Sequence, residues 1–321
     1  MYFKLINCMI KNNNLTQAKK AKNDEFYTLI EDVEKEVSQY KDQFKDKVIY
    51  CNCDDYKCSN FYKYFKDHFK EYKLKRLIAS CLTGEYASYD GNVETTGKLQ
   101  NGDFRKEESV ELLKQSDIIC TNPPFSLFEE YIKQLLSSGK KFLILGNNNA
   151  CPQLIQYFKN KKLRLGYSVN KTMEFEMPDN YKSNIKNSNG KKVGKVPAIS
   201  WFTNFEITPN EKLALIKKYN STDFPTCDNY NAIYVDKVAN IPKDYNGAMA
   251  VPITILKYMN KNNIITCEAD GKTKFYKILG ATYSSDKSNE TQSIRTDPKK
   301  RHNPFVNGKE KYTKILIQRI S

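Results

Sequence analysis

Apolar positions recur at helical spacing near the start of the chain. From Ala21 to Tyr40 the sequence is polar at first and then becomes amphipathic. The apolar positions of one face are Leu29, Val33, Val37 and Tyr40. This spacing predicts an amphipathic helix. Thr28 and Glu31 stand three residues apart at its beginning, which is the pattern of a capping box.

After Lys47, short apolar runs alternate with stretches of helical character. The runs are Val48 to Cys53, Phe61 to Phe69, Leu77 to Leu82, Ile118 to Cys120 and Phe142 to Leu145. Strands that alternate with helices predict an α/β fold with a parallel sheet and helices on both faces. Ligands of such sheets bind at the carboxyl ends of the strands. The candidate positions are therefore Asn52 to Asp55, Ser80 to Gly84, Asn101 to Phe104, Thr121 to Phe125 and Gly146 to Asn149.

Beyond residue 160 the pattern changes to aromatic and β-branched runs separated by loops. The runs are Ala198 to Phe205, Ala232 to Val235, Val251 to Leu256, Phe275 to Leu279 and Tyr312 to Ile320. They predict a partly β region that lies beside the α/β core, because no Pro/Gly/Ser linker divides the two. We therefore expect a core in residues 1–160 and a second region in residues 161–321. Mobile surface loops are predicted at Asp179 to Lys195 and at Ser284 to Lys311, which includes Lys299, Lys300, Arg301 and His302.

The composition excludes several classes of protein. Of the 321 residues 40% are hydrophobic, which indicates a folded core and rules out a disordered chain. No apolar run approaches the roughly 20 residues that cross a bilayer, and the patch Tyr2 to Ile10 is short and lacks a cleavage site. The nine Cys are odd in number and scattered, which fits reduced thiols. We expect a soluble, unprocessed, cytoplasmic protein.

The charge balance points to a partner. The 52 Lys and Arg exceed the 37 Asp and Glu by 15, so the net charge is +15. Because Lys and Arg neutralise phosphates, nucleic acid is favoured, although a Lys-rich proteome could give the same balance without any function. Cys51, Cys53 and Cys58 lie close together in the sequence, but no Cys-x-x-Cys or His pair completes a zinc site. We therefore expect no metal.

One segment carries the chemistry. The apolar strand Ser116 to Cys120 is followed at once by Thr121-Asn122-Pro123-Pro124-Phe125 and then by a helical run. The two prolines stiffen the turn and should leave the carbonyls of Asn122 and Pro123 free at the carboxyl edge of the sheet. An exocyclic amino group can donate to the Asn122 side chain and to the Pro123 carbonyl, which directs its lone pair toward an electrophile. Phe125 offers a face for a planar base.

The same segment could be no more than a strand-to-helix turn, for which Asn and Pro are ordinary residues. Its place after an apolar strand and before a helix, in a basic α/β protein, favours the chemical interpretation. A second segment, Asn303-Pro304-Phe305, has one Pro and no apolar strand before it, so it is interpreted as a loop.

The segment TNPPF resembles the catalytic motif of the amino-group DNA methyltransferases, which use S-adenosylmethionine to methylate adenine N6 or cytosine N4. Nearly the whole chain resembles the EcoRI-type modification methylases, which are adenine-specific. The similar segments are AKNDEFYTLIEDVEKE, KVIYCNCDDYKCSNFYKYF, KRLIASC, GDFR, SDIICTNPPFSLFEEYI, KKFLILGN, CDNYNAIYV and DYNGAMAVPITIL. The resemblance implies a Rossmann-like S-adenosylmethionine-dependent methyltransferase sheet with helices on both faces, and a partly β target-recognition region.

The resemblance also implies the residues of the site. The catalytic residues are Asn122, Pro123, Pro124 and Phe125. The residues that line the methionine end of the cofactor are Phe26, Tyr27 and Thr28. The residues of the cofactor loop after the first strand, and of the helix that follows, are Asn52, Asp54, Asp55, Ser59 and Asn60. The usual glycine-rich loop is absent there, and Cys-Asn-Cys-Asp-Asp stands in its place.

The cofactor adenine is assigned by the resemblance to Asp103 and Phe104, whose carboxylate accepts from the adenine amino group and whose ring stacks on it. The acidic residue usual after the second strand is not evident, since Ser80 and Cys81 fall there. The residue that binds the ribose of the cofactor is therefore not assigned.

The implied mechanism is direct attack of the amino nitrogen on the methyl carbon, without a Cys nucleophile or a His base. Double-stranded DNA is the implied partner, and the adenine must rotate out of the duplex. A monomer that needs no stable protein partner is expected. Whether the site is GAATTC stays open, as do two alternatives: an RNA adenine, or a protein glutamine amide as in the release-factor methyltransferases. A chain that has lost catalysis is disfavoured, because the motif is intact.

Overall fold

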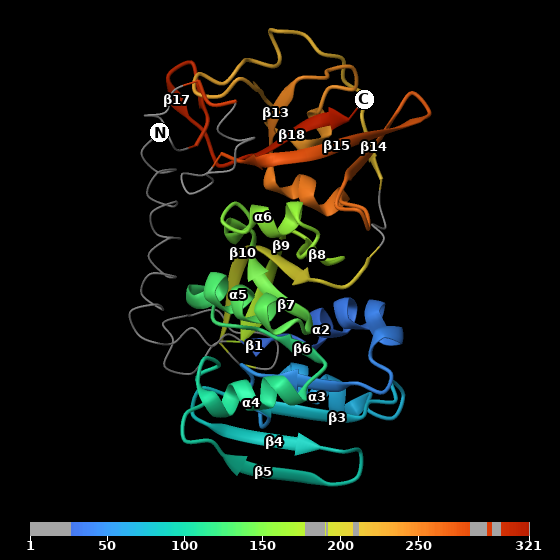
Figure 1. Cartoon of the computed structure of the whole chain (residues 1–321), viewed down its shortest axis with the longest axis vertical. Helices are drawn as coiled ribbons and strands as arrows, with labels where there is room; N and C mark the ends of the chain where they lie inside the picture. The colour runs from blue at the N-terminus through green and yellow to red at the C-terminus, as the bar shows by residue number, and fades with distance from the viewer. Residues whose placement is uncertain are drawn as a thin grey trace. The chain divides into compact units, whose positions relative to one another are not determined.

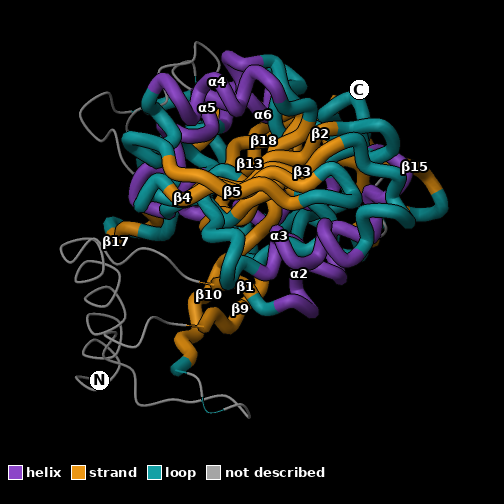
Figure 2. The backbone as a smooth tube through the Cα atoms, turned by 90° about the horizontal axis from the view of Figure 1, so that it is seen from below, coloured by secondary structure: helices purple, strands orange, loops and turns teal. Residues whose placement is uncertain are grey.

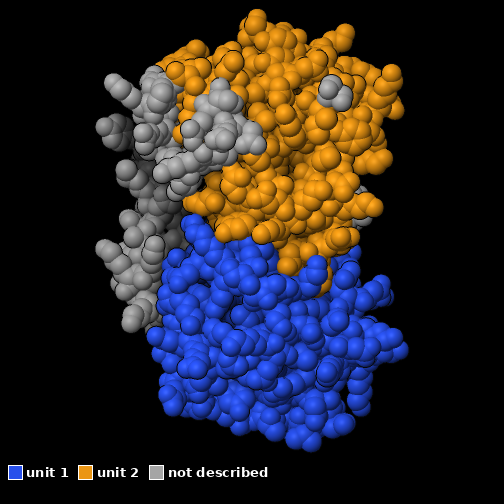
Figure 3. Space-filling view, viewed as in Figure 1, with its two compact units in different colours: residues 1–146, 172–197 blue, residues 147–171, 198–321 orange. Residues whose placement is uncertain are grey.

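The computed structural model of the protein describes residues 27–176, 190, 192–207, 212–282, 294–296 and 303–320. The predicted cofactor residue Phe26 lies outside these residues, and so do Lys299, Lys300, Arg301 and His302. The chain forms two compact units, one of residues 1–146 with 172–197 and the other of residues 147–171 with 198–321 (Figure 3). The functional division at residue 160 stays a prediction.

The larger of the two main sheets has ten strands in the order β1-β9-β10-β7-β6-β2-β3-β4-β5, with β8 paired to β10 (Figure 1). The strands are β1 (Tyr27–Thr28), β2 (Val48–Cys51), β3 (Arg76–Ser80), β4 (Glu85–Tyr89), β5 (Glu94–Lys98), β6 (Ile118–Thr121), β7 (Lys141–Asn147), β8 (Arg164–Leu165), β9 (Lys171–Glu176) and β10 (Val193–Thr203). Strands β7, β6, β2 and β3 are parallel neighbours. Strands β4 and β5 pair antiparallel to this set, and β1 pairs antiparallel to β9. The predicted parallel sheet is therefore correct at the centre and wrong at the edges.

The central strands form where the sequence is continuously apolar. The side chains of Ile49, Leu77, Ile119 and Leu143 have no exposed surface. Strands buried on both faces need such runs. Helices α2 (Ile30–Val37) and α3 (Asn60–Asp67) lie on one face of the sheet, and α4 (Glu107–Gln115) and α5 (Phe128–Ser138) lie on the other (Figure 2). The apolar run at Phe61 to Phe69 supplies the buried residues of α3, which are Phe61, Tyr62, Tyr64 and Phe65, and extends two residues beyond the helix.

The predicted first helix is shorter than its pattern, and its capping box is wrong. Helix α2 begins at Ile30 and is followed by the 3₁₀ helix η1 (Ser38–Gln43). The N-cap is Leu29, which makes no side-chain cap hydrogen bond. Thr28 instead belongs to β1, where pairing with β9 holds its backbone extended. Tertiary strand pairing here overrides the local capping signal.

Strands β4 and β5 form a hairpin that the sequence pattern did not reveal. The turn is built on Asp90, whose side chain accepts from the backbone N–H groups of Asn92 at 2.9 Å and Val93 at 2.8 Å. All five residues of β5 are exposed, so the strand has no apolar run. Because β4 runs antiparallel to β3, this turn lies at the amino end of β3.

The second unit is rich in strands, as the pattern predicted. Its main sheet has the order β11-β14-β15-β18-β13-β12. The strands are β11 (Leu213–Ala214), β12 (Ile233–Tyr234), β13 (Ala248–Val251), β14 (Ile265–Ala269), β15 (Lys272–Ala281) and β18 (Ile315–Ile320). A short pair, β16 (Phe305–Val306) with β17 (Lys309–Glu310), forms separately. The helices are α6 (Ile155–Lys159) and the 3₁₀ helices η3 (Asn148–Ala150), η4 (Val238–Asn240) and η5 (Ile253–Tyr258).

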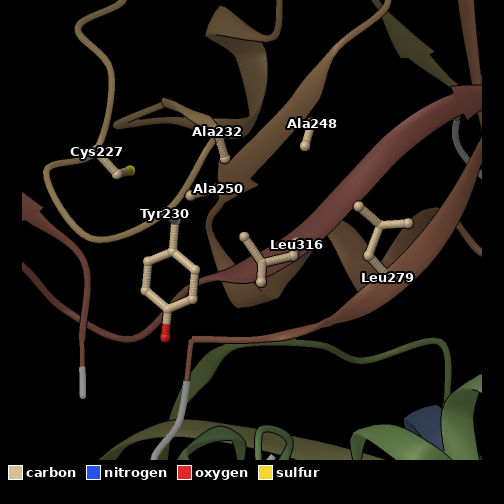
Figure 4. Close-up of a cluster of buried hydrophobic side chains, with 7 residues drawn as sticks. All are labelled: Cys227, Tyr230, Ala232, Ala248, Ala250, Leu279 and Leu316. Carbon is tan, nitrogen blue, oxygen red and sulfur yellow. The ribbon is translucent and has the colours of Figure 1, made fainter. Parts of the chain in front are cut away.

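A small apolar cluster holds this second sheet to the loop before β12 (Figure 4). Its members are Cys227, Tyr230, Ala232, Ala248, Ala250, Leu279 and Leu316. The small side chains of Ala232, Ala248 and Ala250 leave room for the ring of Tyr230, which is fully buried. The predicted strand at Val251 to Leu256 is wrong for most of its length, because β13 ends at Val251 and η5 follows.

Asn229, in the same loop, is fully buried and holds two later segments. Its side chain donates to the carbonyl of Asn303 at 3.0 Å and accepts from the N–H of Phe305 at 2.9 Å. Its carbonyl accepts from the N–H of Thr296 at 3.2 Å. The Asn303-Pro304-Phe305 segment is thus anchored by hydrogen bonds and enters β16, where a loop was predicted.

None of the helices in the described part of the chain is long and apolar enough to span a bilayer.

Candidate active site at the carboxyl edge of the sheet

The order of the central strands places the candidate site between β2 and β6. The chain passes from β2 through α3 to β3 on one side, and from β6 through α5 to β7 on the other side. The two connections therefore leave the carboxyl ends of β2 and β6 in opposite directions. Ligands of open α/β sheets bind at such a reversal. The loops after these two strands, Asn52 to Asp55 and Thr121 to Phe125, are two of the five positions that the sequence predicted for a ligand.

The turn after β6 has the form predicted from its prolines. Pro124 lies at φ −61° and ψ 119°, and η2 (Phe125–Leu127) follows. The Pro124 carbonyl accepts from the N–H of Leu127 at 3.0 Å. The carbonyl of Pro123 accepts no hydrogen bond from the described part of the chain. Asn122, Pro124 and Phe125 are half-buried, so the turn borders both the core and the solvent.

Phe125 has an aromatic contact with the core. Its ring meets that of Phe175 in β9 at 6.3 Å between centroids, with the two planes at 82°. Stacking of a base on Phe125 stays a prediction.

A buried carboxylate ties the loop after β2 to this turn. Asp54 is 8% exposed and accepts from the Ser59 hydroxyl at 2.7 Å. It also accepts a short hydrogen bond from the hydroxyl of Thr121, the residue directly before Asn122. Asp54, predicted as a cofactor residue, therefore links the loop after β2 to the turn after β6.

Tyr131 makes a second link between the same two regions. It lies on α5 and is fully buried, and its hydroxyl donates to the side-chain oxygen of Asn52. Its ring also meets the Phe104 ring edge-on at 5.0 Å. Burial raises the pKa of the Tyr131 hydroxyl well above its ordinary value, so it stays a donor. Sequence reasoning missed this residue, and the available signal was a polar aromatic on the buried side of the helix after the motif.

The predicted cofactor residues at the start of α3 reach β1. The Asn60 side chain donates to the carbonyl of Thr28 at 2.7 Å. Ser59 caps α3 by accepting from two backbone N–H groups, at 3.1 and 3.3 Å. Thr28 is 3% exposed, and its hydroxyl oxygen has no hydrogen-bond partner among the residues that the structure describes. Such a buried, unsatisfied group is uncommon and marks Thr28 as a candidate ligand contact. Tyr27, beside it, is half-buried.

Asp55 makes its hydrogen bonds within the loop after β2 and at the start of α3. Its side chain accepts from the N–H of Lys57 at 3.0 Å, and its carbonyl accepts from the N–H of Ser59 at 2.7 Å. Asp55, Cys81 and Glu85 have potential metal-ligand atoms within 4.8 Å of one another. Glu85 is, however, paired with Lys57 at 2.7 Å.

The loop that carries Asp103 packs against the end of β3. A Cβ at Gly102 would lie 1.8 Å from the carbonyl oxygen of Cys81, so only glycine allows this approach. The N–H of Leu99 also donates to Gly84 at 2.7 Å, which holds the two loops together. Asp103 therefore lies at the same carboxyl edge as the loops after β2 and β6.

Asp103 and Phe104 differ in their exposure. The guanidinium of Arg105 binds both carboxylate oxygens of Asp103, and these hydrogen bonds hold the pKa of that carboxyl below its ordinary value. The Phe104 ring is 5% exposed, and the Arg105 guanidinium lies 5.4 Å from its centroid. The predicted stacking of a cofactor adenine on Phe104 stays a prediction.

Ser80 is the last residue of β3, at the position where the usual acidic residue is missing. It is fully buried and shares a hydrogen bond of 2.7 Å with the Tyr50 hydroxyl. Its side chain is therefore used within the core.

The described cysteines are all free thiols. Burial raises the pKa of Cys51 and Cys120 well above the ordinary value, which keeps them unreactive, whereas Cys58 is exposed and lies outside β2.

The chain matches a described family and its curated members. The family profile described as "Adenine-specific methyltransferase EcoRI" matches residues 14–99 and 85–320. "Type II methyltransferase M.MgeORF184P" of Mycoplasma genitalium is 39% identical, over 96% of this chain and 99% of the relative. "Type II methyltransferase M.EcoRI" of Escherichia coli is 40% identical, over 78% of this chain and 86% of the relative. "Type II methyltransferase M.MpnI" of Mycoplasma pneumoniae is 36% identical, over 94% and 97%. No solved structure matches this chain significantly.

Proposed function

The chain belongs to the EcoRI family of adenine-specific DNA methyltransferases, and from that premise we propose that it transfers a methyl group from S-adenosylmethionine to N6 of an adenine in duplex DNA. The observation that carries the proposal is the rigid turn Thr121–Phe125 at the carboxyl end of β6. Its Pro123 carbonyl is an acceptor without a donor in the described chain. The sequence alternatives, an RNA adenine or a protein glutamine amide, lack the support of the family.

The turn acts on the adenine amino group through two acceptors. One N–H donates to the Asn122 side-chain oxygen and the other to the Pro123 carbonyl. These bonds strengthen as the nitrogen changes from planar to tetrahedral, so they stabilise the transition state more than the ground state. The Thr121–Asp54 hydrogen bond keeps both acceptors in place before the base arrives.

The adenine has to leave the duplex to reach this turn. Its N6 atom takes part in a base pair, and the amino group cannot meet two protein acceptors while stacked in the helix. Phe125 is half-buried and offers a face on which the rotated base stacks. Asn122, Pro123, Pro124 and Phe125 therefore form one pocket wall.

The residues present fit S-adenosylmethionine, which supplies the methyl group when bound. Thr28 offers a buried hydroxyl without a partner, at the position assigned to the methionine end. Asp103 and Phe104 would hold the cofactor adenine, with the Asp103 carboxylate as acceptor for its amino group. Asn52, Asp54, Asp55, Ser59 and Asn60, in the loop after β2 and at the start of α3, and Tyr27 in β1 would complete the cofactor site.

The second unit is proposed to read the DNA sequence. The chain as a whole carries a net charge of +15, which suits a polyanionic duplex. The site methylated is proposed to be GAATTC or a related sequence. One adenine is methylated per event, so a monomer suffices.

The test is methyl transfer from labelled S-adenosylmethionine to unmethylated duplex DNA, followed by base analysis and mapping of the modified position. Wild type is compared with Asn122→Ala and with Asn92→Ala, an exposed asparagine in the turn between β4 and β5. We expect N6-methyladenine at one short sequence. Asn122→Ala should lower kcat by at least about 100-fold, as expected when one transition-state hydrogen bond is lost. Asn92→Ala should match wild type.

DNA that stays unlabelled while the cofactor binds would contradict the proposal that duplex DNA is the substrate. The same assay with RNA or a peptide would then identify the methyl acceptor. Equal activity of Asn122→Ala and Asn92→Ala would contradict the role of the turn.

A further inference from the structure

Arg105 makes three contacts with the candidate site. Its Nε donates to Oδ1 of Asp103 at 2.9 Å, and its Nη2 donates to Oδ2 at 2.6 Å. Its guanidinium lies over the Phe104 ring, 5.4 Å from the centroid. Its Nη1 reaches Glu130, on helix α5, at 3.3 Å. Neither the family profile nor the relatives' names assign a role to this side chain.

The two-point contact fixes the direction of the Asp103 carboxylate. A planar guanidinium that binds both oxygens sets the plane of the carboxylate as well as its distance. The backbone N–H of Arg105 adds a third hydrogen bond to the carboxylate. It is the second one to Oδ1, at 2.9 Å. Of these contacts Oδ2 receives one, and a carboxylate oxygen can accept two. Oδ2 therefore keeps a lone pair, and the Asp103 side chain is 16% exposed.

The contact with Glu130 connects two parts of the site. Asp103 lies in the loop before α4, whereas Glu130 lies in the first turn of α5, five residues after Phe125. Arg105 is 44% exposed and Glu130 53%, so this ion pair contributes little stability by itself. Its effect is to hold the guanidinium between the loop and the helix that follows the catalytic turn.

We propose that Arg105 is a positioning residue for the cofactor: it orients the Asp103 carboxylate so that Oδ2 accepts from the cofactor adenine amino group. The proposal rests on the assignment of Asp103 in the proposed function. Arg105 itself need not touch the cofactor. A purely structural role for an exposed arginine would change unfolding and leave cofactor affinity unaffected.

The charged groups around Asp103 lead to a pH test. The hydrogen bonds and charge of Arg105 lower the pKa of the Asp103 carboxyl, and the charge of Lys106 adds to this effect. Two acidic side chains contact the same region. Glu130 accepts from Arg105, and Glu108 accepts from the N–H of Gln100 in the loop that carries Asp103. Without Arg105 the pKa of Asp103 should rise, so the carboxyl would protonate at a higher pH and lose its acceptor.

The experiment measures the dissociation constant for S-adenosylmethionine by calorimetry between about pH 4 and pH 8, a range that begins near the ordinary pKa of an Asp carboxyl. The proteins are wild type, Arg105→Ala, Arg105→Lys and Asp103→Asn, with Lys106→Ala as the control that removes a neighbouring charge without a hydrogen bond. We expect Arg105→Ala to weaken binding by about tenfold at pH 8 and further toward pH 4. Arg105→Lys should recover part of the affinity, and Lys106→Ala should change it less than about twofold. In methyl transfer, KM for the cofactor should rise while kcat at saturation stays near wild type.

Each outcome separates the two assignments. Wild-type affinity in Arg105→Ala, together with weak binding in Asp103→Asn, would overturn the role of Arg105 and keep that of Asp103. Tighter binding in Arg105→Ala would also overturn it, because the guanidinium would then occupy the place of the ligand on Phe104. Wild-type affinity in Asp103→Asn would remove the premise and the proposal together, while the Asn122→Ala assay would still test methyl transfer.

Discussion

At the residue scale, the hydroxyl of Tyr131 can be removed while its ring stays in place. It connects helix α5 to Asn52, and both residues are buried. Tyr131→Phe keeps the ring that packs against Phe104. The variant leaves the Asn52 oxygen without this donor, which costs the hydrogen bond and the desolvation of a buried acceptor.

We predict that Tyr131→Phe lowers the free energy of unfolding by about 1 to 3 kcal/mol and raises KM for the cofactor several-fold. Urea unfolding and a cofactor titration measure the two effects. The matched control is Tyr157→Phe, because the Tyr157 hydroxyl makes no hydrogen bond within the described chain. Equal behaviour of the two variants would contradict the positioning role of Tyr131.

A buried lysine in the second unit gives a pH-dependent prediction. Lys314 is 5% exposed, and its ammonium lies 4.6 Å from the ring centroid of Tyr234. Its only other contact through Nζ within the described chain is a long one of 3.5 Å to the carbonyl of Asp236. Burial therefore lowers the pKa of Lys314 to about 8.

Between about pH 8 and the ordinary lysine pKa near 10.4, the unfolded chain binds this proton more tightly than the folded one. The contribution of Lys314 to the free energy of unfolding therefore rises with pH across that range. Below about pH 8 the buried ammonium is charged, and the full cost of burying that charge applies. Lys314→Met should be more stable than wild type at pH 7 by up to about 3 kcal/mol, and the difference should shrink toward pH 10. Urea unfolding at both pH values measures it, with the exposed Lys277→Met as the control. A difference that is independent of pH would refute the burial penalty.

At the scale of elements, the loop with Asp103 depends on its contact with the end of β3. The absence of a side chain at Gly102 permits that contact. A methyl group there would displace the loop or the Cys81 carbonyl, and backbone cannot move aside as a flexible side chain can.

Gly102→Ala should weaken cofactor binding by at least about tenfold and destabilise the fold by about 1 to 3 kcal/mol, as overpacked substitutions do. Calorimetry and thermal unfolding measure the two effects. Gly139→Ala is the control, because Gly139 ends α5 at φ +68° with no atom within 4 Å of its Cβ position. It should cost about 1 kcal/mol of backbone strain and keep wild-type affinity. Undisturbed binding in Gly102→Ala would show that the loop does not need this contact.

The elements also show what a sequence can predict. Strands β2, β3, β6 and β7 were found because burial on both faces makes them continuously apolar. Strand β5 (ETTGK) was not predicted because all its residues are exposed, so it has no apolar pattern. Only its pairing with β4 makes it a strand. The turn after β6 was predicted because its signal lies in five consecutive residues, Thr121 to Phe125, and its catalytic role stays a prediction. The links of Tyr131 to Asn52 and of Arg105 to Asp103 depend on helix placement and rotamers, which no local pattern specifies.

At the scale of the whole molecule, the net charge of +15 predicts how DNA binding responds to salt. Lys and Arg that neutralise phosphates release counterions, so affinity falls linearly on a logarithmic scale as salt rises. Raising the salt from about 50 to 200 mM should weaken binding to non-specific duplex DNA by at least about 100-fold. Fluorescence anisotropy with a labelled duplex measures it, and cofactor affinity over the same range is the comparison. Salt-insensitive DNA binding would refute a phosphate-dominated interface.

The β4–β5 hairpin offers a practical attachment point. Its turn, Asp90 to Val93, lies at the amino end of β3, whereas the candidate site lies at the carboxyl ends of the parallel strands. The sheet therefore separates the two. A fluorophore on Asn92→Cys, in a protein that also carries Cys8→Ser, Cys53→Ser and Cys58→Ser, would report on tumbling or immobilise single molecules at the edge of the sheet opposite the candidate site. Optical recording of individual methylation events then becomes feasible with the protein tethered away from the residues proposed to bind its ligands.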